Sequence, residues 1–227
     1  MVLHAGGVRG TVLTPAGAVC QSFEKAGMRV RPVKGLSQFD NTRYGYYRKV
    51  RWLILLRELF LLPFAFVGLW RLRHEPFDLV HINEITLLPL GILAKWLLRV
   101  PMVVHVRSLQ RKPGSGMRTR WVNALLRRYA DAVVAIDYTV AATLEADLPL
   151  RIIHNGLDVA GQSVDFGSAL NGGPVKVGFL GVLIPLKGIF ELVEAMHLLK
   201  LRGINIECLI AGENARRLSG VKAWLLG

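Results

Sequence analysis

Apolar positions recur along this chain with two alternating periods. Short apolar runs, typical of buried strands, are separated by segments in which apolar residues return every three or four positions, as in helices. The clearest case is Val175 to Gly212, where an apolar run is followed by a glycine loop, a helical pattern and a second apolar run. Further strand patterns cover Thr11–Thr14, Met28–Val33, Phe77–Ile82, Pro101–Val106, Ala132–Ile136 and Leu150–Ile153.

Helical patterns alternate with these strands, which sets the expected fold. They cover Ala16–Ala26, Leu87–Leu98, Arg118–Tyr129 and Val140–Ala146. Strands separated by helices of about ten residues pair in parallel, so the pattern predicts a Rossmann-like α/β domain with a parallel sheet covered on both faces. A stretch rich in glycine and serine follows and is typical of a linker. We expect a first domain over 1–158, a linker over 159–174, and a second, incomplete unit over 175–227 that ends in a helix over 214–226.

The longest apolar run, Trp52 to Trp70, leaves three interpretations open. It could be a buried or cleft-side helix, a helix lying in a membrane interface, or a membrane span. Its length approaches that of a span, but Arg57, Glu58 and Pro63 are unfavourable in lipid. Arginine and lysine residues flank the run on both sides, and tryptophans mark its ends, which suits an anionic membrane surface.

The overall charge narrows the class of partner. The 227 residues carry 29 Lys and Arg against 16 Asp and Glu, for a net charge of +13, which favours anionic partners. No RNP-like, helix-turn-helix or zinc-finger signature accompanies this charge, so we expect no nucleic acid partner. Cys20 and Cys208 form no CxxC pattern, which indicates neither a disulfide framework nor a zinc site and fits the cytoplasm. The N-terminus lacks the pattern of a secretory signal.

The segment after the strand Val175–Leu180 carries the most specific chemistry. Gly181 allows a sharp turn, and Lys187 and Gly188 come directly before a helical pattern. The backbone N–H groups of a helix N-terminus and its dipole attract anions, and a lysine adds a full positive charge. The pattern therefore indicates a phosphate-binding site, although an ordinary turn with a solvated lysine fits the spacing equally well.

Several motifs, taken in order, resemble the retaining GT-B glycosyltransferases of family 4, the glycosyl transferases group 1. The resemblance implies two Rossmann-like domains with parallel sheets that face a cleft. It also implies a nucleotide-sugar donor held mostly by the C-terminal domain, with neither a metal nor a cofactor. The motifs are DLVHINE, PMVVHVRS, YADAVVAI, IIHNGLD, VGFLGVLIPLKGIFELVEAM and CLIAGEN.

The resemblance assigns donor-binding roles in the second unit. In the family, a GR-x4-K pattern faces the donor diphosphate, and Gly181, Lys187 and Gly188 occupy the corresponding segment. Val182 stands where the family has arginine, and Leu186 stands where it has an acidic residue. The family's E-x7-E motif would lie beyond the last residue of the sequence. The resemblance thus implies an incomplete site of doubtful activity in this chain, and it assigns no catalytic residue.

In the first domain, four residues follow or end strands at the edge where α/β sheets bind ligands. Arg107 aligns with a donor-contacting histidine of the family and His105 lies two residues earlier, so either could contact the donor. His105 could instead pack against a neighbouring strand. Asn83 and Glu84 follow another strand and could touch the acceptor, although Asn83 could simply cap a helix.

The function implied by the resemblance is transfer of a sugar from a nucleotide sugar to a glycan or lipid-linked acceptor. Polysaccharide or cell-envelope glycan biosynthesis is the expected setting. The expected location is cytoplasmic, including a peripheral position at the inner face of the cell membrane, where the basic charge finds anionic lipid. The alternative, from a different class, is a non-catalytic basic α/β module that binds a membrane surface or a partner subunit.

Overall fold

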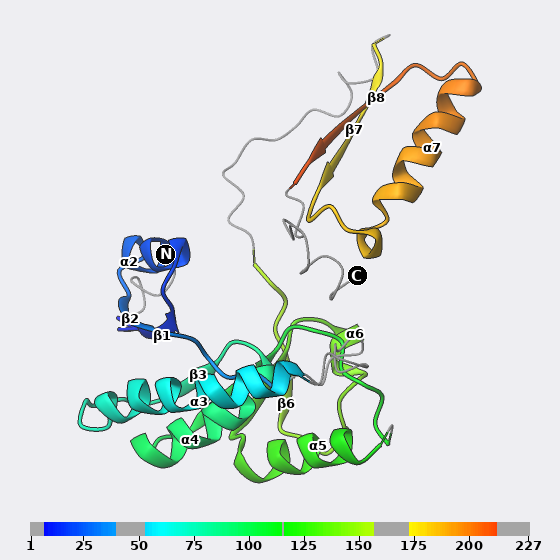
Figure 1. Ribbon diagram of the computed structural model, residues 1–227. Helices are drawn as coiled ribbons and strands as arrows, with labels where there is room; N and C mark the ends of the chain where they lie inside the picture. Colours follow the sequence, from blue (N-terminus) through cyan, green and yellow to red (C-terminus); the bar gives the residue numbers. More distant parts are fainter. Residues whose placement is uncertain (1–6, 40–52, 115, 157–172, 213–227) are drawn as a thin grey trace. The chain divides into compact units, whose positions relative to one another are not determined.

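The computed structural model describes residues 7–39, 53–114, 116–156 and 173–212. These residues belong to two compact units, Met1–Gly156 and Leu157–Gly227, and each is described by itself (Figure 1). Every strand pair is parallel, as the alternation of strand and helix predicts. Most of the predicted linker and the predicted helix over 214–226 lie outside the described residues.

The first unit begins with a small β-α-β segment. Strands β1 (Thr11–Pro15) and β2 (Arg29–Val33) pair with each other, with helix α2 (Ala18–Lys25) between them. The sequence predicts one continuous sheet in this domain, but among the described residues these two strands form a sheet of their own. Their sheet is fixed to the rest of the unit through β2, which contacts helix α3 (Leu53–Leu72), and through the ion pair between Arg29 and Glu75, at 2.7 Å.

The main sheet that the structure describes in the first unit has four strands in the order β3-β4-β5-β6. Consecutive strands are neighbours, so their carboxyl ends meet at one edge, and the α/β architecture with parallel sheets is confirmed. The strands are β3 (Val80–Ile82), β4 (Met102–Val106), β5 (Ala132–Ala135) and β6 (Leu150–Ile152). The connections are a 3-10 turn η2 (Ile85–Leu87) leading into α4 (Leu88–Leu98), then α5 (Met117–Tyr129), then α6 (Tyr138–Ala141).

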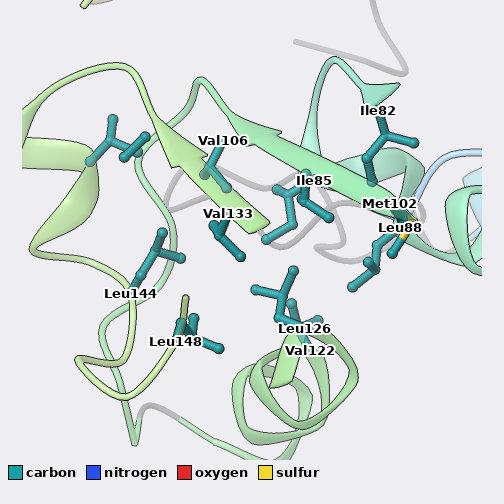
Figure 2. Packing of buried hydrophobic residues seen from close by; sticks show 13 residues of the cluster. Ile82, Ile85, Leu88, Met102, Val106, Val122, Leu126, Val133, Leu144 and Leu148 are labelled. Atoms are coloured by element: carbon teal, nitrogen blue, oxygen red, sulfur yellow. The ribbon is translucent and has the colours of Figure 1, made fainter. Parts of the chain in front are cut away.

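The hydrophobic core lies on one face of this sheet (Figure 2). Side chains of a strand alternate between faces, and in β4 it is Met102, Val104 and Val106 that are fully buried. Helix α5 covers them with Val122 and Leu126, four residues apart and therefore on one side of the helix. The packing explains why the strands read as apolar runs and α5 as an amphipathic pattern.

Helix α3 is the apolar run of the sequence, and it is buried on one side only. Ala65, Leu69 and Leu72 lie in the interior, whereas Leu56 and Leu59 on the opposite side are more than 60% exposed. Glu58 is buried, accepts a hydrogen bond of 2.6 Å from the backbone N–H of Gln38, and pairs with Arg57. Within the parts of the chain that the structure describes, no helix combines the length and hydrophobicity that crossing a membrane requires.

The prediction of a helix over Val140–Ala146 is wrong at both ends. Helix α6 begins at Tyr138 because Asp137 caps it, accepting a hydrogen bond of 2.7 Å from the backbone N–H of Val140. The helix ends at Ala141, and the chain continues in tight turns that place Leu144 and Leu148 in the core. The apolar residues beyond Ala141 therefore reflect burial and not helical periodicity.

The described part of the second unit forms one β-α-β motif. Strands β7 (Val175–Leu180) and β8 (Ile206–Ala211) pair along six residues, from Val175 opposite Ile206 to Leu180 opposite Ala211. A 3-10 turn η4 (Pro185–Lys187) and helix α7 (Ile189–Leu201) connect them. None of the described residues in these elements is fully buried, unlike those of the four-stranded sheet.

Replacing Leu126 with alanine tests where the stability of the first unit resides. Leu126 is 0% exposed, so its removal leaves a cavity under the sheet, and we expect the free energy of unfolding to fall by about 2–5 kcal/mol. Urea unfolding measures the change. The matched control is Leu59→Ala in α3, because Leu59 is 64% exposed and its loss should change stability by less than about 0.5 kcal/mol. Equal effects of the two substitutions would contradict this core.

Candidate functional site

The carboxyl edge of the four-stranded sheet brings two predicted residues together. Asn83 follows β3 directly and Arg107 follows β4 directly, and both side chains are exposed. The Arg107 guanidinium donates a hydrogen bond of 3.4 Å from Nη1 to Oδ1 of Asn83. A cation and an amide therefore lie side by side at the carboxyl edge of the sheet, where α/β proteins commonly bind ligands.

Glu84 is held beside this pair by two hydrogen bonds. Its Oε1 accepts from the backbone N–H of Ile85 at 2.9 Å, so Glu84, and not Asn83, caps the short turn η2. Its Oε2 accepts from the hydroxyl of Ser108 at 2.8 Å, which links the ends of β3 and β4. The sequence interpretation missed Ser108, whose only signal is its position immediately after Arg107.

His105 lies inside β4, where it packs against a neighbouring strand. Its ring stacks on that of His81 in β3 with the centroids 5.7 Å apart, and its Nε2 is buried with no hydrogen-bond partner among the described residues. Burial lowers the pKa of His105, and the positive charges of His81 and Arg107 lower it further. Partial desolvation of its ring also lowers the pKa of His81, although the residue as a whole is exposed to solvent. The arrangement matches the packing alternative and favours two neutral imidazoles.

In the second unit, Gly181, Lys187 and Gly188 lie between the end of β7 and the start of α7. The backbone N–H of Gly181 donates to Ala211 at 3.0 Å, which extends the ladder by one residue. The backbone N–H groups of Lys187 and Gly188 donate to Ile184 and Pro185, closing the 3-10 turn. Gly188 has a φ of 75°, a conformation that favours glycine.

The backbone N–H groups that could bind an anion lie just after Gly188, at the start of α7. Because Lys187 and Gly188 use their N–H groups in the turn, the donors left at the helix N-terminus are those of residues 189–191, which have no partner within a helix. The exposed Lys187 side chain lies two residues before Ile189, the first residue of α7, and adds its charge.

Gly212, just after β8, is a position that the sequence interpretation missed. A Cβ atom at this position would lie 1.8 Å from the carbonyl oxygen of Gly181, so only glycine fits without moving the backbone. Gly181 and Gly212, which directly follow β7 and β8, therefore lie against each other through their main chains. A close contact of this kind leaves no periodic signal in a sequence.

Glu191 places a negative charge at the same helix N-terminus. It lies in the first turn of α7, and its Oε2 is 3.8 Å from where a Cβ on Gly188 would be. An acidic residue there stabilises the helix dipole, but it also competes with any anion that approaches. No group of three or more His, Cys, Asp or Glu side chains able to hold a metal ion occurs among the residues that the structure describes.

Comparison with known proteins identifies the family. Residues 2–156 match the family described as glycosyl transferase 4-like domain, which is more than half of the chain. The chain belongs to this family. No curated protein sequence matches it.

Solved structures share the fold of this glycosyl transferase 4-like chain. One is Anabaena HepE in complex with UDP and glucose, with a TM-score of 0.55 and 19% identity over 90% of this chain and 62% of HepE. HepE in complex with UDP-glucose gives 0.52 and 18%, over 90% and 61%. Acinetobacter baumannii MurG gives 0.50 and 16%, over 92% and 61%. The chain has the GT-B type of α/β fold and spans about 62% of the length of HepE.

Because of the two stacked histidines, we expect the free energy of unfolding to fall below about pH 6.5. Their pKa values are lowered by folding, so in this range the unfolded chain binds more protons than the folded one, and the free energy of unfolding falls as the pH falls. Urea unfolding of the wild type at about pH 7.5 and about pH 5.5 measures the difference. We expect His105→Gln to reduce it.

The control for this titration is His74→Gln, which removes an exposed histidine and should leave the difference unchanged. The carboxylate of Asp131 does not interfere, because its hydrogen bond from Lys95 lowers its pKa and moves its effect to more acidic pH. A difference that His105→Gln leaves at its wild-type size would contradict the proposed origin.

Proposed function

We propose that this protein is a retaining glycosyltransferase that moves a sugar from a nucleotide-sugar donor to a glycan or lipid-linked acceptor. The observation that carries the proposal is the edge of the second unit, where Lys187 and the start of α7 lie at the carboxyl end of β7 in a chain of the glycosyl transferase 4-like family. Polysaccharide or cell-envelope glycan biosynthesis in the cytoplasm, at the inner face of the membrane, is the setting we propose.

The chemistry explains the residue types at this edge. As the glycosidic bond to the donor breaks, negative charge develops on the departing diphosphate while the sugar becomes oxocarbenium-like, and stabilising that charge lowers the barrier. Lys187 would supply a full positive charge, and the N–H groups of residues 189–191 would donate hydrogen bonds to phosphate oxygens. Gly181 and Gly188 keep the backbone of this turn open to a ligand. The proposal assigns no metal to the site and no residue to a covalent step.

The edge of the first unit offers its own candidate residues to this proposal. Arg107, held by Asn83, would orient the donor, since its guanidinium is exposed and can bind phosphate or sugar hydroxyls. His105 is the weaker candidate for that role because its ring packs on His81. Asn83 and Glu84 would contact the acceptor, because their amide and carboxylate oxygens can accept hydrogen bonds from sugar hydroxyls.

The alternative proposal is a non-catalytic basic module that binds a membrane surface or a partner subunit. The net charge of +13 and the exposed apolar side of α3 favour it. The two proposals differ in one measurable property, because only the first requires a nucleotide sugar to bind. UDP-glucose is the first probe, since HepE has been crystallised with it, and a GDP-sugar is the second.

Lys187→Ala tests the donor site by isothermal titration with UDP-glucose and with a GDP-sugar. Removing one charge-assisted contact to the diphosphate should weaken binding by about tenfold or more. Lys200→Ala is the matched control, because Lys200 is also an exposed lysine of this motif but lies in the last turn of α7. Absence of binding by the wild type, or equal weakening by the two variants, would remove the proposed site.

Glu191→Gln tests the same helix N-terminus with the opposite sign. Removing a negative charge that competes with the diphosphate should strengthen binding by about two- to fivefold, the usual size of a single charge effect at a helix end. Glu194→Gln, one turn further along α7, should change the affinity far less. The same titration measures both, and weaker binding by Glu191→Gln would show that the diphosphate does not lie at this end of the helix.

A further inference from the structure

Helix α3 presents a continuous apolar stripe on its exposed side. The stripe follows a spacing of three and four residues, so its members lie along one side of the helix, opposite the side that is buried. All are large, and each is exposed by more than a third of its surface. We call this set the α3 stripe, and it consists of Leu56, Leu59, Phe60, Phe66, Val67 and Trp70.

The stripe continues onto helix α4 through two tryptophans. Helices α3 and α4 pack side by side (Figure 1). A depression of about 410 Å³ is lined by both Trp70 and Trp96, and an adjoining one of about 590 Å³ is lined by Trp96 and Pro89 of α4. Trp96 is 73% exposed, the largest exposure of any tryptophan that the structure describes. The stripe and these depressions form one surface, named here the α3–α4 surface.

Arginines lie beside the aromatic end of this surface. The guanidinium of Arg73 lies 4.3 Å from the ring centroid of Trp70, and its Nη1 donates a hydrogen bond of 2.8 Å to the Trp70 carbonyl oxygen. Arg99 lines both depressions together with Trp96, and Arg71 is exposed at the end of α3. Tryptophan next to arginine is typical of the boundary between the acyl chains and the headgroups of a bilayer.

Three carboxylates on or beside α3 and α4 are paired with cations. Glu58 bonds to Arg57, Glu75 bonds to Arg29 and Arg31, and Asp131 bonds to Lys95. These pairs leave Arg71, Arg73 and Arg99 to give the surface a positive charge. An apolar surface with a positive rim complements an anionic bilayer in both hydrophobicity and charge.

We propose that the α3–α4 surface docks the protein on an anionic membrane, with α3 lying in the plane of the interface. The α3 stripe would enter the boundary of the acyl chains, Trp70 and Trp96 would lie at headgroup level, and the three arginines would contact lipid phosphates. Helix α3 lies on the membrane and does not cross it, because its other side is packed into the first unit. The proposal names the surface behind the peripheral location given above, but it needs no donor site.

Vesicle flotation of the full chain, without any nucleotide sugar, tests the proposal. The probes are phosphatidylcholine vesicles with and without phosphatidylglycerol, at about 0.1 M and about 0.5 M salt. We expect binding only when phosphatidylglycerol is present, and weaker binding at the higher salt. Since the experiment contains no donor, a failure here leaves the glycosyl transfer proposal intact, and failure of donor binding leaves this one intact.

Exposed positions, together with the half-buried Arg73, supply the variants. Trp96→Ser combined with Leu59→Ser should lower the vesicle partition coefficient by about tenfold or more, because two large side chains no longer enter the interface. Arg73→Gln combined with Arg99→Gln should remove most of the dependence on phosphatidylglycerol and on salt. Trp121→Ser is the matched control, since Trp121 is 57% exposed but lies on α5, and it should bind as the wild type does.

Three outcomes would overturn the proposal. One is that the wild type does not float with anionic vesicles. Another is that Trp96→Ser with Leu59→Ser binds as well as Trp121→Ser does. The third is that analytical ultracentrifugation shows self-association relieved by Leu59→Ser while no vesicles bind, in which case a second copy of the chain covers the surface.

Discussion

The parallel pairing of β3, β4, β5 and β6 over one buried face is the constraint on which the first unit depends. Each parallel strand must be followed by a crossover, and the crossover helices bury the apolar face that the sheet presents. The same pairing brings every carboxyl end to one edge, so residues 24 positions apart in the sequence, Asn83 and Arg107, become neighbours. At the amino end of the sheet, Asp131 accepts hydrogen bonds from both Lys95 and the backbone N–H of Met102, which fixes α4 to the starts of β4 and β5. The candidate site thus follows from the topology, whereas the side chains at that edge decide its chemistry.

Both units pair parallel strands connected by a helix, but they bury their side chains to different extents. In the first unit, thirteen residues form a buried cluster beneath the sheet, whereas β7, β8 and α7 of the second unit contain no fully buried side chain among the residues described. Burial of apolar surface is the main stabilising contribution to a fold. The described part of the second unit is therefore held mainly by the six-residue ladder between β7 and β8 and by the contact of α7 with β8. The phosphate-binding role proposed for this motif needs only a strand end, a turn and a helix start, which so small a motif can supply.

Local periodicity predicted the strands and most helices. A strand buries every second side chain and a helix every third or fourth, so both patterns are visible in the sequence. It predicted β7 with the observed bounds and α7 from its apolar spacing, and it located Gly181, Lys187 and Gly188 through the glycine turn. Local periodicity failed where a contact between residues far apart in the sequence determines the structure. The length of α6 depends on capping by Asp137 and on the burial of Leu144. The role of Ser108 depends on Glu84, which follows the neighbouring strand β3, and the separate pairing of β1 with β2 depends on which strands meet in space. His105 remained open for the same reason, because only the register of β3 against β4 puts it beside His81.

The contact between Gly181 and Gly212 has a consequence for how the second unit would receive a ligand. Because the carbonyl oxygen of Gly181 fills the space that a side chain on Gly212 would need, the ends of β7 and β8 lie against each other through their main chains. A loop that is already held by its neighbour has little conformational entropy left to lose when a ligand arrives, and such preorganisation strengthens binding without adding a contact. A larger residue at position 212 would separate the loops and reintroduce that entropic cost, even though no atom of Gly212 needs to touch the ligand.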